Sequence, residues 1–263
     1  MPPVENAPET PAAVDTHCHL FLIEDDPAKV MEEARAAGVD RVICVGIDPG
    51  TSRRSLEMAE SFRGVFATAG MHPHTASDFD QRAGSSIEEL LAHPTVVAVG
   101  ETGLDYYRNL SPVEDQRSAF RTHIRLSRET GKPLVVHVRE AWDDAMAILA
   151  EEEAEHVVLH CFSGDEAVAA EAEARGYFVS FAGNLTYPGA DALRRAAAAL
   201  GEDRILAETD SPFLTPQPFR GDPNRPSKLP ATLNELARAR GIDPHEATRR
   251  TAQAAFAAFP LIR

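Results

Sequence analysis

The sequence predicts an α/β protein with the architecture of a single (β/α)8 TIM-type barrel. Eight apolar, β-branched runs recur at regular intervals along the 263 residues, with helical patterns between them. Most of these runs are continuously apolar, which is typical of parallel strands buried on both faces. The length and the hydrophobic content of 43% suffice for one large core. A doubly wound open sheet is the alternative.

The expected strands set the places where functional side chains should be sought. In chain order they occupy residues 12–19, 41–47, 65–71, 96–102, 133–139, 156–162, 177–183 and 204–210. In a barrel of this kind, functional side chains lie at the C-terminal ends of the strands or just beyond them. The ends of these segments should therefore meet at one mouth.

Capping residues mark the ends of the intervening helices. Asp26 and Pro27 begin the first helix as N-cap and first-turn residue, and Gly38 ends it. A Pro-rich loop over 211–230 follows the last strand, and two further helical segments come after it. Other helices are expected over 111–131, 164–176 and 189–201, each ending at a glycine.

We expect one barrel domain over residues 12–263 behind a flexible N-terminal tail over 1–11, with two smaller domains as the alternative. The tail carries prolines and acids and lacks a signal-peptide pattern. No run of about 18 apolar residues predicts a membrane span. The three cysteines are odd in number and widely spaced, which favours a reduced, cytoplasmic protein.

Side chains that bind metals lie at the ends of several expected strands. His17 and His19 are separated by one residue, so both imidazoles point to the same face of the first strand. Each candidate alone has an ordinary explanation as a core histidine, a helix N-cap or a solvated acid. Together, at one mouth of a barrel, they predict a metal centre. The other members of the set are Glu101, His137, His160 and Asp210.

Four imidazoles and two carboxylates exceed what one tetrahedral ion requires, so we expect two divalent ions. Glu101 is the expected bridge because it lies in the middle of the strand order. The histidines of the first strand and Asp210 would hold one ion, and His137 and His160 the other. Such mixed ligands suit Zn, Mn, Ni or Co and tolerate Mg less well.

The formal net charge of −15 restricts the partners that the protein can bind. Broad, non-specific binding of nucleic acid needs a basic surface, which this composition does not supply. Two divalent ions held by two carboxylates would nevertheless create a locally positive site. An anionic substrate such as a phosphate ester would be attracted to that site.

A set of short stretches runs in order over nearly the whole chain past the tail. They are DTHCHL (15–20), GMHPH (70–74), GETGLDYY (100–107), QRSAFRTHIRLS (116–127), KPLVVHVREAW (132–142), HCFSG (160–164) and ETDSPFLTP (208–216). In these stretches the chain resembles the TatD family of metal-dependent deoxyribonucleases, within the amidohydrolase-like barrels. GETGLDYY and ETDSP carry the most specific part of the resemblance.

The resemblance implies a TIM-type barrel, a divalent-metal centre and hydrolysis of phosphodiester bonds in DNA, often from a 3′ end. It implies ligand roles for the same six residues that the strand ends indicate. The chain departs from the family in one loop, where Asn224, Arg225 and Pro226 stand in place of the usual Asn-Glu-Pro. A base thus replaces an acid, which could alter the substrate preference.

Catalytic and positioning roles can be assigned to several residues as hypotheses. We expect Asp210 to act as general base, since it can contact both a metal and the nucleophile, beside the bridging Glu101. His72 and Arg139 are the expected phosphate contacts, because an imidazole donates hydrogen bonds and a guanidinium clamps phosphate. An ordinary salt bridge is the alternative for Arg139. Asp105 is expected to orient a ligand histidine.

Further side chains near the mouth have two interpretations each. Tyr106, Tyr107 and Phe213 either stack on bases or pack within loops. Arg225, together with Arg220 and Lys228, either meets a DNA backbone or is solvated surface. Two cysteines next to ligand histidines, Cys18 and Cys161, should point to the opposite strand face and pack under the helices.

Two other functions remain open. A metal-dependent hydrolase of a small ester, lactone or amide would share the barrel and the ions, since fold does not fix function. Many such enzymes bridge their ions with a modified lysine, whereas the fourth strand here offers Glu101. The second alternative is a non-catalytic metal-binding barrel that acts through a partner. The complete ligand set and the candidate base argue against it.

Overall fold

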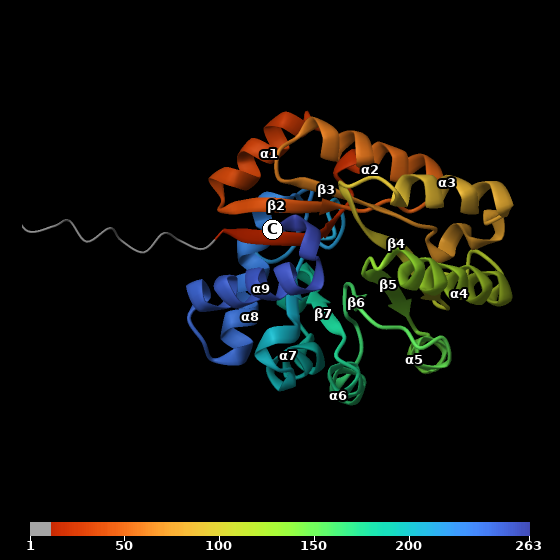
Figure 1. Ribbon diagram of the computed structural model, residues 1–263. Helices are drawn as coiled ribbons and strands as arrows, with labels where there is room; N and C mark the ends of the chain where they lie inside the picture. The colour runs from red at the N-terminus through yellow and green to blue at the C-terminus, as the bar shows by residue number, and fades with distance from the viewer. Residues whose placement is uncertain (1–11) are drawn as a thin grey trace, which may run out of the picture.

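The computed structural model describes residues 12–263, which fold into one α/β domain built on eight parallel strands (Figure 1). Each strand pairs with the next in chain order, so the sheet curls into a nearly closed TIM-like barrel and the open doubly wound alternative is wrong. The expected tail over 1–11 lies outside the described residues. The strands are β1 (Ala13–Cys18), β2 (Val39–Cys44), β3 (Val65–Ala69), β4 (Val96–Asp105), β5 (Leu134–Arg139), β6 (Val157–Leu159), β7 (Phe178–Phe181) and β8 (Ile205–Ala207).

Helices alternate with the strands and surround the barrel (Figure 1). α1 (Pro27–Ala36) begins as the sequence predicts, because the Asp26 side chain accepts a hydrogen bond from the Ala28 N–H at 3.0 Å. α4 (Val113–Thr130) ends at Gly131, whose φ of 65° suits glycine. The others are α2 (Pro49–Ser61), α3 (Gln81–Leu91), α5 (Trp142–Glu151), α6 (Glu166–Ala174), α7 (Asp191–Ala199), α8 (Leu229–Arg240) and α9 (Pro244–Ala258).

All eight expected runs form strands, but only β5 ends at the residue that the pattern predicts. β4 continues to Asp105, so Glu101 lies inside the strand and not at its end. A register shift in the β4–β5 pairing accompanies this part of the strand. β6 and β8 have only three residues each, so His160 and Asp210 lie in the turns that follow them.

The barrel closes between β8 and β1 through contacts that lie mostly beyond the end of β8. The Asp210 N–H donates to the carbonyl of His17 at 2.9 Å. The buried carboxylate of Asp15 accepts hydrogen bonds from the backbone N–H and the hydroxyl of Thr209, at 2.9 and 2.6 Å. These contacts fix the turn after β8 against the first strand and hold Asp210 beside His17.

The interior of the barrel is a packed core, and α9 contributes to it. Inward-facing branched side chains from most strands are buried with small and aromatic residues of the C-terminal helix. The cluster includes Val14, Ile43, Val97, Val135, Val158, Leu206, Ala255 and Phe259. Within residues 12–263, no helix has both the length and the apolar composition needed to cross a membrane.

Candidate metal centre

A cavity of about 570 Å³ opens at the C-terminal ends of the strands. Its volume lies in the range of roughly 300–1,000 Å³ that is common for sites binding one small ligand. Only one predicted ligand, His17, is absent from its wall, because this side chain lies fully buried beneath the others. Five of the predicted ligands line the wall: His19, Glu101, His137, His160 and Asp210.

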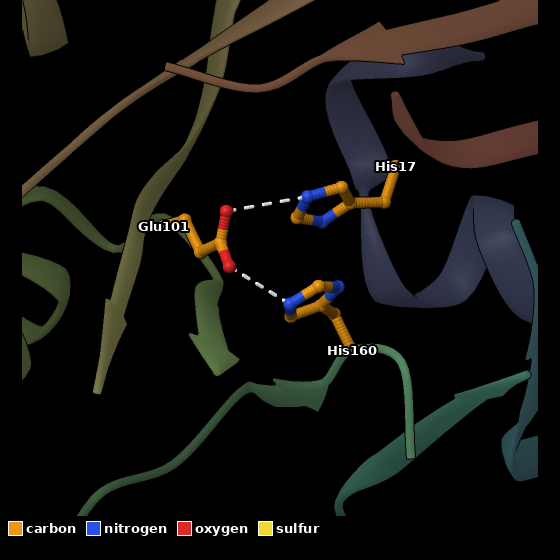
Figure 2. A group of neighbouring side chains, drawn as sticks. All are labelled: His17, Glu101 and His160. Atoms are coloured by element: carbon orange, nitrogen blue, oxygen red, sulfur yellow. Dashed lines mark ion pairs between the residues drawn. The ribbon is translucent and has the colours of Figure 1, made fainter. Parts of the chain in front are cut away.

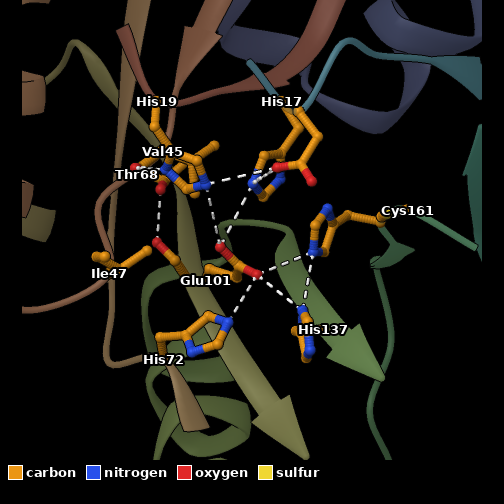
Figure 3. Close-up of polar contacts among 12 residues, drawn as sticks. His17, His19, Val45, Ile47, Thr68, His72, Glu101, His137 and Cys161 are labelled. Carbon is orange, nitrogen blue, oxygen red and sulfur yellow. Dashed lines mark hydrogen bonds and ion pairs between the residues drawn. The ribbon is translucent and has the colours of Figure 1, made fainter. Parts of the chain in front are cut away.

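Glu101 lies at the centre of the imidazoles (Figure 3). Its Oε2 lies 3.4 Å from Nε2 of His17 and 3.8 Å from Nε2 of His19. Its Oε1 lies 2.9 Å from Nε2 of His160 and 3.1 Å from Nδ1 of His137. Figure 2 shows His17 and His160 on the two oxygens of the same carboxylate. The two oxygens therefore face the two histidine pairs that the sequence assigns to separate ions.

Asp210 joins the first of these pairs. Its Oδ1 lies 3.6 Å from Nε2 of His19 and 3.8 Å from Nε2 of His17, so the three residues can hold one ion. Two further groups with ligand atoms within 4.8 Å of one another share Glu101: His17–Glu101–His160 and His72–Glu101–His137.

Hydrogen bonds on the far side of each ring decide which nitrogen offers its lone pair to the site. Nδ1 of His19 donates to the carbonyl of Val45 at 2.9 Å, which leaves Nε2 free. Nε2 of His137 donates to Oδ2 of Asp105 at 3.2 Å, which leaves Nδ1 free toward Glu101. Asp105 thus lies where the sequence predicts an orienting carboxylate.

Glu208, which is not among the predicted site residues, orients His160 in the same way. The fully buried Glu208 accepts hydrogen bonds at Oε1 from Nδ1 of His160, at 3.2 Å, and from the Cys161 N–H, at 2.8 Å. Nε2 of His160 therefore faces Glu101, with Nδ1 of His137 3.3 Å away. The available signal was an acid that directly follows an apolar strand run, two residues before Asp210.

His72 is oriented the opposite way. Its Nδ1 accepts a hydrogen bond from the His74 N–H at 3.1 Å, so the proton of the neutral ring is on Nε2, 3.3 Å from Oε1 of Glu101. Burial lowers the pKa of His72 to about 4, so the ring is neutral near pH 7. His72 therefore presents a hydrogen-bond donor to the site and not a lone pair.

The buried polar atoms at the centre fit a bound cation. Both ring nitrogens of His17 and Oε2 of Glu101 are buried without a hydrogen-bond partner, which costs about 1–3 kcal/mol per group. Burial lowers the pKa of His17. Burial alone would raise the pKa of Glu101, but His160, His72 and His17 hold it well below its ordinary value. Burial alone would lower the pKa of His160, but the Glu101 and Glu208 carboxylates hold it well above its ordinary value, so this ring must give up a proton to bind a metal. Imidazoles grouped around an ionised carboxylate are the donor set of a divalent metal.

Arg139 lies in the cavity wall as well. Its guanidinium stacks over the ring of Tyr107, 3.9 Å from the ring centroid. No carboxylate of residues 12–263 forms an ion pair with it, so the salt-bridge alternative is not observed. A cation without an acidic partner, held in place by a ring, remains available to an anion.

Two predicted substrate contacts lie away from the cavity. Tyr106 lies in the turn after β4 and points to the helix side, where its hydroxyl donates to Asp144 of α5 at 2.6 Å. Arg225 forms ion pairs with Asp25 and with Glu33, the latter at 2.9 Å. Neither residue lines the cavity, and we retain neither as a substrate contact.

The two cysteines beside ligand histidines differ from each other. Cys18 is buried with Val30 and Met31 under α1, as the strand alternation predicts. Cys161 lines the cavity instead, so the expectation that it packs outward is wrong. β6 ends before this residue, and Cys161 has a φ of 46° in the following turn, where strand alternation does not apply.

A nearly closed barrel whose mouth carries His, Glu and Asp groups able to bind metal defines a metal-dependent hydrolase with an amidohydrolase-like fold. The family model for TatD related DNase matches residues 14–260, so the chain belongs to the TatD family. The protein named uncharacterized metal-dependent hydrolase YabD, from Bacillus subtilis (strain 168), is 40% identical over 227 residues, or 85% of this chain and 89% of that protein.

Two further relatives extend the comparison. The 3′-5′ ssDNA/RNA exonuclease TatD of Cronobacter sakazakii is 34% identical over 229 residues, covering 84% of this chain and 87% of that protein. The crystal structure of YJJV, a TatD homolog from Escherichia coli K12, superposes with a TM-score of 0.90 at 27% identity, over 94% of this chain and 98% of that one. The fold is thus shared with the YJJV structure along nearly the whole chain.

Proposed function

We propose that the protein hydrolyses phosphodiester bonds of DNA, working from a 3′ end with two divalent ions. The observation that carries this proposal is the position of Glu101, whose two carboxylate oxygens face separate histidine pairs. Such a carboxylate can bridge two ions, and paired ions are typical of enzymes that cleave phosphate esters. The exonuclease name of a relative at 34% identity supports the choice of substrate.

The residues present divide into two sets of ligands. His17, His19 and Asp210 would hold one ion, His137 and His160 would hold the other, and Glu101 would bridge them. Bound divalent ions lower the pKa of water to about 7 and stabilise charge on phosphoryl oxygens. Zn, Mn, Mg, Ni and Co are the candidate ions, and the ligand set suits Mg least.

Three residues of the chain would then act on the substrate. Asp210 is the proposed general base, because its carboxylate lies in the cavity wall and is partly open, with 13% of its side chain exposed. The Nε2–H of His72 would donate a hydrogen bond to a phosphoryl oxygen. Arg139 would hold a phosphate with its guanidinium, which the ring of Tyr107 keeps in place.

The cavity also limits the form of the substrate. Its volume of about 570 Å³ suits one or a few nucleotides and not a duplex. With a net charge of −15, the protein lacks the broad basic surface that binds DNA along its length. The terminus of a single strand fits a cavity of this volume and does not need a broad basic surface.

The test is metal-dependent cleavage of single-stranded DNA labelled at its 3′ end. Protein stripped of metal is reconstituted with Mn, Mg, Zn, Ni or Co, and Asp210→Asn, shown to be folded, is the matched control. We expect release of labelled mononucleotides by the wild type and loss of this release in the variant. DNA that stays intact with every ion, while the protein hydrolyses a small ester, lactone or amide, would contradict the proposal.

A further inference from the structure

Two loops form adjoining walls of the cavity at the seam between β8 and β1. The loop after β1 contributes Leu22, and the loop after β8 contributes Phe213 and Leu214. Phe213 is 52% exposed, and its ring lies edge-on to His19 with the centroids 6.0 Å apart. β8 has only three residues, and its pairing with β1 ends at Ser211, whose carbonyl accepts a hydrogen bond from the His19 N–H at 2.7 Å. Contacts between the loops therefore set the opening beyond Ser211.

Arg225 connects these two loops from outside the cavity. Its guanidinium lies 2.9 Å from Glu33 of α1 and also pairs with Asp25, three residues after Leu22. We call Arg225, Asp25 and Glu33 the Arg225 clasp. The clasp is partly shielded, since the arginine side chain is 21% exposed and the two acids are 37% and 35% exposed. A planar guanidinium can engage two carboxylates in a fixed geometry, which a lysine cannot do.

Asn224 extends the effect of the clasp toward the cavity. Its fully buried amide donates to the carbonyls of Thr209, at 2.8 Å, and Phe213, at 2.5 Å. Its Oδ1 accepts a hydrogen bond from the Arg225 N–H at 2.9 Å. Asn224, the residue next to the clasp, therefore fixes the turn that carries Phe213 through two hydrogen bonds.

We propose that Arg225 is a positioning residue that sets the opening between Leu22 and Phe213, and with it the affinity for the substrate strand. Arg225 acts through the loops, because it does not line the cavity. The effect falls mainly on binding, since Asp210 is held separately by the hydrogen bond from its N–H to the carbonyl of His17. The identity of the substrate rests on the function proposed above, whereas the clasp itself does not.

The test first reverses the charge of Arg225. A second substitution then restores the ion pair between positions 225 and 33 with the two charges exchanged. Arg225→Glu places three acids together, so hydrogen–deuterium exchange in segments 20–25 and 211–224 should become at least about tenfold faster. The KM for a single-stranded oligonucleotide should rise about tenfold, as expected for the loss of two partly exposed ion pairs, with kcat nearly unchanged. Adding Glu33→Arg to Arg225→Glu should return both the exchange rate and KM toward the wild-type values.

Arg220→Glu is the matched control, because it makes the same charge change in the same loop at a residue that instead contacts Tyr187. It should leave exchange in both segments unchanged. Unchanged exchange in Arg225→Glu, or a KM increase that the charge swap does not reduce, would overturn the proposal. If no nucleic acid is cleaved with any metal, the function proposed above fails, and the exchange measurements alone decide whether the clasp exists.

Discussion

His72 and His160 lie on the same oxygen of Glu101, yet they present opposite groups to it. In the neutral ring, Nε2 of His160 offers a lone pair because Nδ1 donates to Glu208, whereas Nε2 of His72 carries the proton because Nδ1 accepts from His74. Distance alone does not separate the two roles, since both rings lie within 3.3 Å of the carboxylate oxygen. The hydrogen-bond partner on the far side of each ring distinguishes the two roles.

This difference predicts distinct losses in two alanine variants. His160→Ala should lose bound metal, whereas His72→Ala should keep the metal content of the wild type and lose turnover by about 100-fold, the effect of removing one hydrogen-bond donor. Metal content is measured on dialysed protein, and circular dichroism confirms that both variants are folded. Loss of metal from His72→Ala as large as that from His160→Ala would show that His72 is itself a ligand.

At the scale of elements, α4 holds the segment that carries His72. His123 of α4 is fully buried, and its Nε2 accepts a hydrogen bond from the Met71 N–H at 3.0 Å while its Nδ1 donates to the carbonyl of Ala119 at 2.7 Å. Burial lowers the pKa of His123 to about 4. A protonated ring would lose the contact with Met71, so the neutral form is the one that stabilises this part of the fold.

The depressed pKa of His123 predicts a pH dependence of stability. The unfolded ring titrates near 6.5, so between about 4 and 6.5 the unfolded chain binds more protons, and stability falls as the pH falls through this window. The contribution is about 2 kcal/mol at pH 5 relative to pH 7. His123→Gln keeps an acceptor for Met71 and lacks this titration. Urea unfolding with a chelator present should therefore show a smaller loss between pH 7 and 5 in the variant, and equal losses would contradict the assignment.

The sequence predicts the type and order of the elements better than their ends. All eight apolar runs are strands, because burial on both faces of a parallel sheet requires apolar residues throughout. The same apolar residues continue past the end of β6 into a buried turn, so the pattern does not show that Cys161 has left the strand. Tyr106, which follows the last residue of β4, packs within a loop, the second of its two interpretations.

At the scale of the whole molecule, the metal site joins strands that are distant in the chain. Its ligands come from β1 and the residue after it, from β4 and β5, and from the turns after β6 and β8, so bound ions link nearly the entire barrel. Ions that bind only the folded state stabilise it by mass action. Removal of the metal should therefore weaken the fold as a whole and not one loop.

Stripping the metal should lower the midpoint of thermal unfolding by about 10 °C. At saturation, bound metal stabilises the folded state by roughly 4 kcal/mol, which corresponds to such a shift in a chain of this size. Differential scanning calorimetry of the chelated protein, and of the same sample after Mn is restored, measures this shift. Glu101→Gln should show little response to added metal. A midpoint that neither chelator nor any added ion changes would contradict a metal centre that spans the barrel.

The strand-end ligands were predictable because barrel topology alone brings the ends of parallel strands to one mouth. The partners of Arg225 were not, since Glu33 and Asp25 lie 192 and 200 residues away in the sequence and no periodicity links them. Glu208 falls between these cases. It is visible as an acid beside an apolar run, but its partner His160 follows a different strand, β6.

The measurement that tests the central claim most directly is a Mn²⁺ titration followed by electron paramagnetic resonance, with turnover of single-stranded DNA recorded on the same samples. If Glu101 bridges two ions, the wild type binds two equivalents, its spectrum shows a magnetically coupled pair, and cleavage rises with the second equivalent. Glu101→Gln then loses the coupling and the cleavage together. A single equivalent at saturation, with the spectrum of isolated Mn²⁺ in an active wild-type enzyme, would contradict the bridged two-metal centre.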